Sequence, residues 1–225
     1  NGNLNGNDWS YETIKDSIDR SLQRLKIEYL DLIQLHSCDI NTLKNGESIT
    51  AVQDAQKEGK ARFIGYSGDN DDAHWAVNSK IFSTLQTSFN LVEQHARTTG
   101  LLEKAKKNNM GIIIKRPIAG GSWHRATSKN SEQKIRAYDD PYLQRAMAMR
   151  ALGGIKNESE NGILTSMGYT IQNPNVDVII IGTTNINHLR NNLHMIKKEL
   201  PIEENIISEL NKRFELLDND WHQRT

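Results

Sequence analysis

Five short apolar stretches of this sequence each end near a side chain that can form hydrogen bonds. These side chains are His36, Ser67, Gln86, Lys115 and Thr183. Imidazole, hydroxyl, amide and ammonium groups can hold a polar ligand or exchange a proton with it. Alternatively, they only form hydrogen bonds with backbone groups of a neighbouring loop and have no further role. If the stretches are parallel strands of one fold, their carboxyl ends gather at the same edge and the five side chains belong to one candidate site.

Apolar periodicities predict the elements that position these side chains. Apolar residues recur at helical spacing from Ile14 to Leu25 behind Ser10, a candidate N-cap. Strands are predicted over 29–36, 62–66, 82–86, 111–115 and 176–181. Helices are predicted over 11–25, 41–58, 71–78, 93–108, 141–152, 159–172, 187–198 and 203–217, with a long loop and added helix over 116–140.

The alternation of strands and helices predicts a parallel sheet covered by helices, for which two architectures compete. A doubly wound sheet normally carries a glycine-rich phosphate turn directly after a strand. The sequence contains neither G-x-G-x-x-G nor G-x-x-x-x-G-K-S/T. A (β/α)8 barrel places its chemistry at the carboxyl ends of its strands, where this sequence is polar. The pattern therefore favours the barrel.

Composition excludes several classes of protein. The 225 residues are 36% hydrophobic, and 28 basic residues balance 28 acidic ones without a dense basic run. No apolar stretch approaches the roughly 18 to 20 residues that span a bilayer, and residues 1–10 are polar where a signal peptide is apolar. We therefore predict one cytoplasmic domain over residues 1–225 that binds neither nucleic acid nor a membrane.

The sequence predicts no metal site. Its one cysteine, Cys38, rules out an internal disulfide and a site built from several thiolates. We interpret Cys38 as a buried or incidental thiol. The seven histidines are scattered, and no H-E-x-x-H, C-x-x-C or EF-hand spacing occurs.

Five motifs resemble the aldo-keto reductase family. They are S-I-D-R-S-L-Q-R-L-K-I-E-Y-L-D-L-I-Q-L-H (17–36), KARFIGYSG (60–68), LQTSFN (85–90), GIIIKRPIAGG (111–121) and VIIIGTTNINHLRNN (178–192). In the family's numbering they correspond to the fourth to eighth strands. The resemblance thus implies the C-terminal two-thirds of the family's chain, from the helix before the fourth strand onward. The implied fold is a partial (β/α)8 TIM barrel, N-terminally incomplete, with the first three strands absent.

The resemblance assigns roles to the first three polar strand ends. His36 matches the catalytic histidine that orients and polarises the substrate carbonyl through a hydrogen bond. Ser67 and Gln86 match positions that hydrogen-bond the nicotinamide carboxamide. Gly68 stands where many members have an asparagine, so one amide contact is expected to be missing.

The resemblance also implies the remaining cofactor contacts. Lys115 stands where many members stack an aromatic ring on the nicotinamide, and its aliphatic stem could cover that ring. The loop that passes over the pyrophosphate begins with Arg116, Pro117 and Ile118. The adenosine side of the cofactor is matched by Gly182, Thr183, Thr184, His188 and Asn192, the first three at an anion site before a helix N-terminus.

The resemblance implies the cofactor NADP or NAD. Members that strongly select NADP place a lysine and an arginine near the 2′-phosphate, whereas this sequence has Gly182 and His188 there. We therefore expect little discrimination between the two nucleotides.

The family's proton donor is a tyrosine, activated by a lysine and supported by an aspartate, and all three come from the first three strand regions. No residue of this sequence matches them, because Tyr11 and Tyr29 lie in other places. We therefore expect a fragment that is inactive by itself, with open sheet edges through which it associates with other copies.

Two hypotheses of different classes follow for the function. One is an NAD(P)H-dependent oxidoreductase that reduces a small-molecule aldehyde or ketone. The alternative is a non-catalytic barrel that binds the nicotinamide nucleotide as a sensor or partner subunit.

Overall fold

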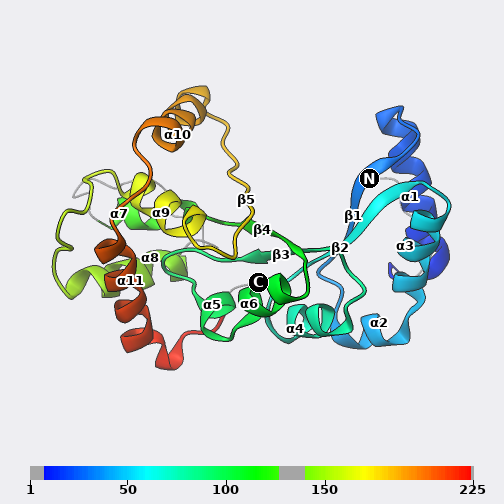
Figure 1. The fold of residues 1–225 in the computed structure, drawn as a ribbon, viewed down its shortest axis with the longest axis horizontal. Helices are drawn as coiled ribbons and strands as arrows, with labels where there is room; N and C mark the ends of the chain where they lie inside the picture. The colour runs from blue at the N-terminus through cyan, green and yellow to red at the C-terminus, as the bar shows by residue number, and fades with distance from the viewer. Residues whose placement is uncertain (1–7, 127–139, 224–225) are drawn as a thin grey trace. The chain divides into compact units, whose positions relative to one another are not determined.

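A computed structural model describes residues 8–126 and 140–223 of the chain as an α/β protein (Figure 1). The chain forms two compact units. One comprises Asn1–Thr87 and Glu103–Ile112, and the other comprises Ser88–Leu102 and Ile113–Arg224. Each unit is described by itself below. No helix among the described residues is long and apolar enough to cross a membrane.

Three parallel strands form the sheet of the first unit. They are β1 (Leu30–His36), β2 (Ala61–Ser67) and β3 (Thr84–Ser88). The fourth strand, β4 (Gly111–Lys115), begins next to β3. The amide of its first residue, Gly111, donates a hydrogen bond of 3.0 Å to the carbonyl of Ser83, which directly precedes β3. The three strands and this contact confirm the predicted parallel arrangement.

Helices α1 (Tyr11–Leu25) and α3 (Glu47–Lys57) lie side by side next to the β1 and β2 strands (Figure 1). Helix α1 has the predicted bounds because Ser10 caps it: the serine hydroxyl accepts a hydrogen bond from the Thr13 amide. The predicted helix over 41–58 is two helices, α2 (Ile40–Asn45) and α3. Gly46 separates them at φ 87°, a left-handed conformation that glycine adopts without steric cost.

Helix α4 (Asn70–Ser79) also belongs to the first unit, and α6 (Leu101–Lys107) lies across the division between the units. Together with α5 (His95–Thr98), α6 replaces the single helix predicted over 93–108. Gly100, at φ 74°, interrupts it.

In the second unit, the end of β4 pairs in parallel with β5 (Val178–Ile179). The ladder extends only to the Ile180 amide, which donates to the Ile114 carbonyl at 2.9 Å, so β5 is shorter than predicted. The helical elements of this unit are η1 (Ala119–Gly121), α7 (Ser122–Arg125), α8 (Asp140–Ala151), α9 (Gly162–Ile171), α10 (Ile186–Lys198), α11 (Glu204–Leu217) and η2 (Asp218–Asp220). Part of the long loop predicted over 116–140, residues 127–139, lies outside the described residues.

The strands are arranged in chain order, β1-β2-β3-β4-β5. Within residues 8–126 and 140–223, this confirms the predicted number of strands, their order and their parallel direction. The interpretation of the fold as strands four to eight of a TIM barrel is corrected to a five-stranded parallel α/β sheet. Apolar periodicity counts strands and places them in sequence, and polar strand ends are shared by barrels and open sheets, so neither shows whether a sheet closes. The numbering of the strands as four to eight came from the resemblance.

Candidate active site

The register of the first unit places three predicted site residues on adjacent strands. His36 is opposite Ser67, and Ser67 is opposite Gln86. Two backbone hydrogen bonds continue the ladders past the strand ends, from the Ser37 amide to the Ser67 carbonyl (2.8 Å) and from the Gly68 amide to the Gln86 carbonyl (3.0 Å). The structure therefore brings the three residues together at the carboxyl edge of β1, β2 and β3, with the side chain of His36 exposed.

The Ser67 hydroxyl at this edge is buried without a hydrogen-bond partner among the described residues. Ser67 is only 1% exposed. A buried hydroxyl without a partner loses roughly 1–3 kcal/mol of hydration that a ligand could restore. A carboxamide fits this need because it carries both a donor and an acceptor. The unpaired Ser67 hydroxyl thus agrees with a nicotinamide carboxamide as its partner.

A second layer of polar side chains lies two residues earlier along β1 and β3. Side chains alternate between the faces of a strand, so Gln34 shares a face with His36, and Thr84 shares a face with Gln86. The atoms Nε2 of Gln34 and Oγ1 of Thr84 are also buried and lack partners among the described residues. These two residues were not among the predicted site residues, although the alternation of polar side chains at 34 and 36 could have indicated them.

Gly65 lies between these two side chains and has no room for a larger residue. A Cβ at this position would lie 2.1 Å from Thr84 Oγ1 and 3.2 Å from Gln34 Cγ. We expect Gly65→Ala to lower the free energy of unfolding by about 1–3 kcal/mol, because overpacking forces neighbours out of place. Urea unfolding measures this. Gly154→Ala is the matched control, because a Cβ there meets nothing within 4 Å; equal losses for the two variants would show that crowding at Gly65 is not the cause.

The structure explains why residue 68 is glycine. A Cβ on Gly68 would lie 2.6 Å from the Oη of Tyr66. The Tyr66 side chain is fixed in this place, since it is fully buried and donates a hydrogen bond of 2.8 Å to the Cys38 carbonyl. An asparagine at position 68 is therefore incompatible with this placement of Tyr66.

In the second unit, Lys115 ends β4 and is followed by a left-handed Arg116 at φ 59°. The Arg116 guanidinium donates a hydrogen bond of 2.8 Å to the Ser88 hydroxyl, and its carbonyl accepts one of 3.0 Å from the Asn90 side chain. The resemblance gave no role to Ser88 or Asn90. Both lie within the LQTSFN motif, so the motif also holds the backbone after β4.

The next two predicted residues are anchored to the core of the second unit. The Pro117 carbonyl accepts a hydrogen bond of 3.0 Å from the Thr170 hydroxyl of α9. Ile118 packs against the cluster of Leu164, Met167 and Met195. These contacts fix the course of the chain directly after β4.

The segment between β5 and α10 holds the remaining predicted contacts. Gly182, Thr183 and Thr184 are exposed, and the Thr183 hydroxyl accepts a hydrogen bond of 3.1 Å from the Asn185 amide. On α10, His188 is exposed, whereas Asn192 is only 8% exposed. His188 is therefore open to a ligand on the helix surface, and Asn192 faces the packed side.

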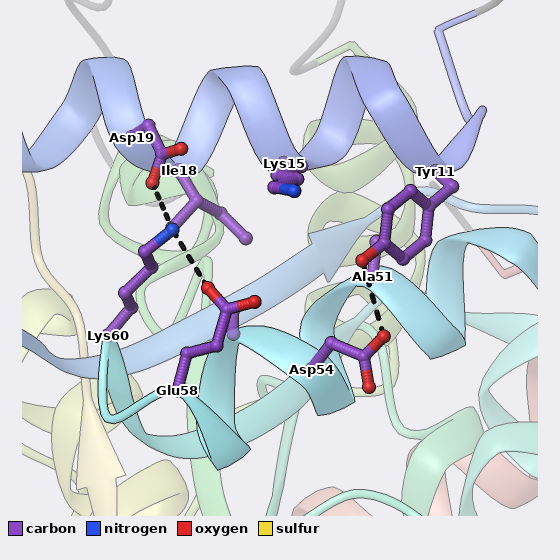
Figure 2. A pocket seen from close by; sticks show the side chains of 9 residues that line it. Tyr11, Lys15, Ile18, Asp19, Ala51, Asp54, Glu58 and Lys60 are labelled. Carbon is purple, nitrogen blue, oxygen red and sulfur yellow. Dashed lines mark hydrogen bonds and ion pairs between the residues drawn. The ribbon is translucent and has the colours of Figure 1, made fainter.

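A separate small pocket lies between α1 and α3. Figure 2 shows Tyr11 of α1 directed at Asp54 of α3 and Asp19 of α1 directed at Lys60. Tyr11 donates a hydrogen bond of 3.3 Å to Asp54, and Lys60 forms ion pairs with Asp19 (2.7 Å) and with another lining residue, Glu58 (2.9 Å) (Figure 2). None of the predicted site residues lines it. Its polar groups are paired with one another, so the carboxyl edge of the sheet is the better candidate site.

Cys38 is fully buried, and burial raises the pKa of its thiol to about 11. The interpretation as a buried thiol is confirmed, since a thiol with such a pKa is a poor source of nucleophilic thiolate at neutral pH. No group of three or more His, Cys, Asp or Glu side chains in the described ranges could hold a metal ion.

A parallel α/β sheet with polar side chains at its carboxyl edge defines a class of proteins that bind small molecules at strand ends. Residues 3–211 match the model of the Aldo/keto reductase family. The chain therefore belongs to the aldo/keto reductase family, as the five motifs predicted.

Relatives of known name cover different shares of the chain. It is 24% identical to L-galactose dehydrogenase of Arabidopsis thaliana over 230 residues, which cover 95% of this chain and 68% of that protein. It is 30% identical to L-glyceraldehyde 3-phosphate reductase of Escherichia coli (strain K12) over 125 residues, which cover 52% of this chain and 35% of that protein. These relatives support an oxidoreductase.

Among solved structures, the holo form of aldo-keto reductase AKR11C1 from Bacillus halodurans is similar with a TM-score of 0.72 and 19% identity. The similarity covers 93% of this chain and 69% of that one. This likeness, with the family match that begins at residue 3, overturns the interpretation as a partial barrel without its N-terminal strands. The error arose because the strands were numbered by matching motifs to the family. No residue of the sequence fixes that numbering.

Proposed function

We propose that the protein carrying this chain is an NAD(P)H-dependent oxidoreductase that reduces aldehydes or ketones. The observation that carries the proposal is the buried, unpaired Ser67 hydroxyl between His36 and Gln86 at the carboxyl edge of the sheet. A hydroxyl and an amide side by side suit a carboxamide, and an exposed imidazole next to them suits a carbonyl.

Each residue of this edge has a distinct task in the proposal. Ser67 and Gln86 would hold the carboxamide and so decide which face of the nicotinamide ring points at the substrate. When bound, the nicotinamide supplies the hydride. His36 would donate a hydrogen bond to the substrate carbonyl oxygen, where negative charge develops as hydride arrives.

The other contacts of the cofactor are assigned to the second unit. We propose that the stem of Lys115 covers the nicotinamide ring and that the segment Arg116, Pro117 and Ile118 follows the pyrophosphate. The anchoring of the Pro117 carbonyl and the Ile118 side chain supports this, because a fixed backbone pre-organises a binding loop. Gly182, Thr183, Thr184, His188 and Asn192 would contact the adenosine part, and Asn192 is the most buried of the five.

No proton donor is assigned among the residues that the structure describes. Tyr11 belongs to the pocket between α1 and α3, and Tyr29 precedes β1 at its amino end. Neither lies at the carboxyl edge that holds His36. The family match over residues 3–211 does not support the expected inactive fragment, so we propose that the protein that carries this chain turns over carbonyl substrates.

Cofactor choice is a separate prediction. Because Gly182 and His188 offer no permanent positive charge for a 2′-phosphate, we expect NADP and NAD to bind with similar affinity. Titrating the protein with each reduced nucleotide and following the nicotinamide fluorescence measures both dissociation constants. A preference for NADP above about 100-fold, roughly 2.7 kcal/mol, would require a phosphate ligand not identified here.

A binding protein without turnover is the alternative function. It predicts tight nucleotide binding and no reduction of any carbonyl compound, so the same titration combined with an assay of NAD(P)H consumption separates the two functions.

We further propose a cytoplasmic location. Self-association through the outer strands also stays a proposal, supported by the half-exposed Val178 and Ile180 at the β5 edge.

A further inference from the structure

Four ionisable side chains of the second unit form a cluster away from the proposed site. Glu93, which precedes α5, is fully buried, and its Oε2 lies 2.7 Å from Nη1 of Arg145 on α8. His95, on α5, lies between two carboxylates: its Nδ1 is 2.5 Å from Glu93 Oε1, and its Nε2 is 3.0 Å from Asp218 Oδ1. The side chains of His95 and Asp218 are 16% and 22% exposed.

This cluster fastens the C-terminal segment 218–222 to the rest of the unit. Asp218 provides the contact with His95, and the carbonyl of His222 accepts a hydrogen bond from Arg145. Between them, the Trp221 ring packs edge-on against Phe214 and lies under the Arg145 guanidinium, 5.0 Å from its carbon. His95 and Arg145 thus each make a polar contact that holds the segment in place.

The charge balance of the cluster depends on the imidazole. With His95 protonated, two cations face two carboxylates. A neutral imidazole has a single N–H, yet both ring nitrogens face carboxylate oxygens, so one nitrogen lone pair would point at an anion. The neutral form also leaves two largely buried carboxylates with Arg145 as the single cation, which is costly at low dielectric.

We propose that His95 is a pH-operated latch, which holds the segment 218–222 in place while the imidazole is protonated and releases it at alkaline pH. The groups that face the imidazole are Glu93, Asp218 and Arg145, with the Phe214 ring packed edge-on against it. The pair Arg97–Glu215 joins α5 to α11 beside it and contains no histidine. The latch does not depend on the proposed reductase activity.

The direction of the switch follows from proton linkage. Burial acts to lower the pKa of His95, but the hydrogen bond with Glu93 and the charges of Glu93 and Asp218 outweigh it and raise the pKa. Glu93 stays beside His95 when the segment leaves, so only the part of the rise that comes from Asp218 is linked to docking. That part stabilises docking while His95 is protonated and is lost as pH rises through the pKa of the docked state. The pKa of Asp218 is also raised, chiefly by burial, so acidification does not oppose docking.

The test follows His95 and Trp221 in the same sample. We expect the His95 ring signals and the Trp221 indole signal in NMR spectra to titrate with one midpoint, above the ordinary pKa of histidine. Amide hydrogen exchange of residues 219–222, referenced to intrinsic rates, should accelerate across this midpoint. The limit is about tenfold for each unit that separates the docked and released pKa values.

Asp218→Asn tests the charge balance without removing the histidine. An asparagine amide can donate to the lone pair of a neutral imidazole, so we expect the segment to stay docked at alkaline pH and the Trp221 signal to lose its titration. His194→Gln is the matched control, because His194 is 67% exposed and lies 3.8 Å from Glu199; its Trp221 titration should equal that of the unchanged protein. The latch would be refuted by a Trp221 signal that does not follow His95, or by an unchanged transition in Asp218→Asn.

Discussion

Replacing His36 by alanine in the protein that carries this chain is expected to lower kcat for aldehyde reduction by about 10²–10³-fold. This is the loss seen when one donor to a developing oxyanion is removed. The dissociation constant for NAD(P)H should change by less than about threefold, because His36 is not among the proposed cofactor contacts. Steady-state kinetics with a panel of aldehydes and ketones, together with nucleotide titration, measure both effects.

Two further variants sharpen this test. His36→Gln keeps a hydrogen-bond donor near the same place and should recover part of the lost turnover. His194→Ala removes an exposed histidine of α10 that belongs to no proposed site, so its kcat should be unchanged. If His36→Ala abolished nucleotide binding while turnover per bound nucleotide was intact, the assignment of His36 to the carbonyl would be wrong.

Local signals predicted the elements that hold the proposed site. The bounds of α1 and β4 agree with the predictions, because Ser10 caps the helix and the apolar run of β4 lies between Gly111 and Lys115. The split at Gly46 was missed, since the helical pattern continues across a residue whose left-handed conformation only the structure shows. The strand β5 was predicted too long because apolarity indicates burial, whereas a strand also needs a partner in register.

The arrangement of the site was predictable only in part. If neighbouring parallel strands end at the same level of the sheet, the residues at their ends lie next to one another. This is enough to place His36, Ser67 and Gln86 together. The partners of Arg116 were not predictable, because Ser88 lies 28 residues away and no motif links the two. The same holds for Glu93 and Arg145, which are 52 residues apart. Such pairs depend on tertiary packing, which single-sequence periodicity does not contain.

The pair of Glu93 and Arg145 carries the largest expected effect on stability. Arg145→Met should lower the free energy of unfolding by about 3–5 kcal/mol, because it leaves the fully buried Glu93 carboxylate without its main cation. For a chain of this size that corresponds to a fall in Tm of about 6–20 °C. His95 can compensate in part only while it is protonated, so the loss should be greater at alkaline pH than at pH 6.

An exposed ion pair and a double variant show whether the loss of stability comes from the unpaired Glu93 carboxylate or simply from removing an arginine. Arg62 and Asp31 lie 2.9 Å apart, but their side chains are 59% and 79% exposed. Arg62→Met should therefore change stability by less than about 1 kcal/mol, as exposed ion pairs do. Adding Glu93→Gln to Arg145→Met removes the unpaired charge and should restore part of the stability lost in the single variant. Equal effects of Arg145→Met and Arg62→Met in calorimetry, or a double variant less stable than Arg145→Met alone, would show that the buried carboxylate is not what makes Arg145 necessary.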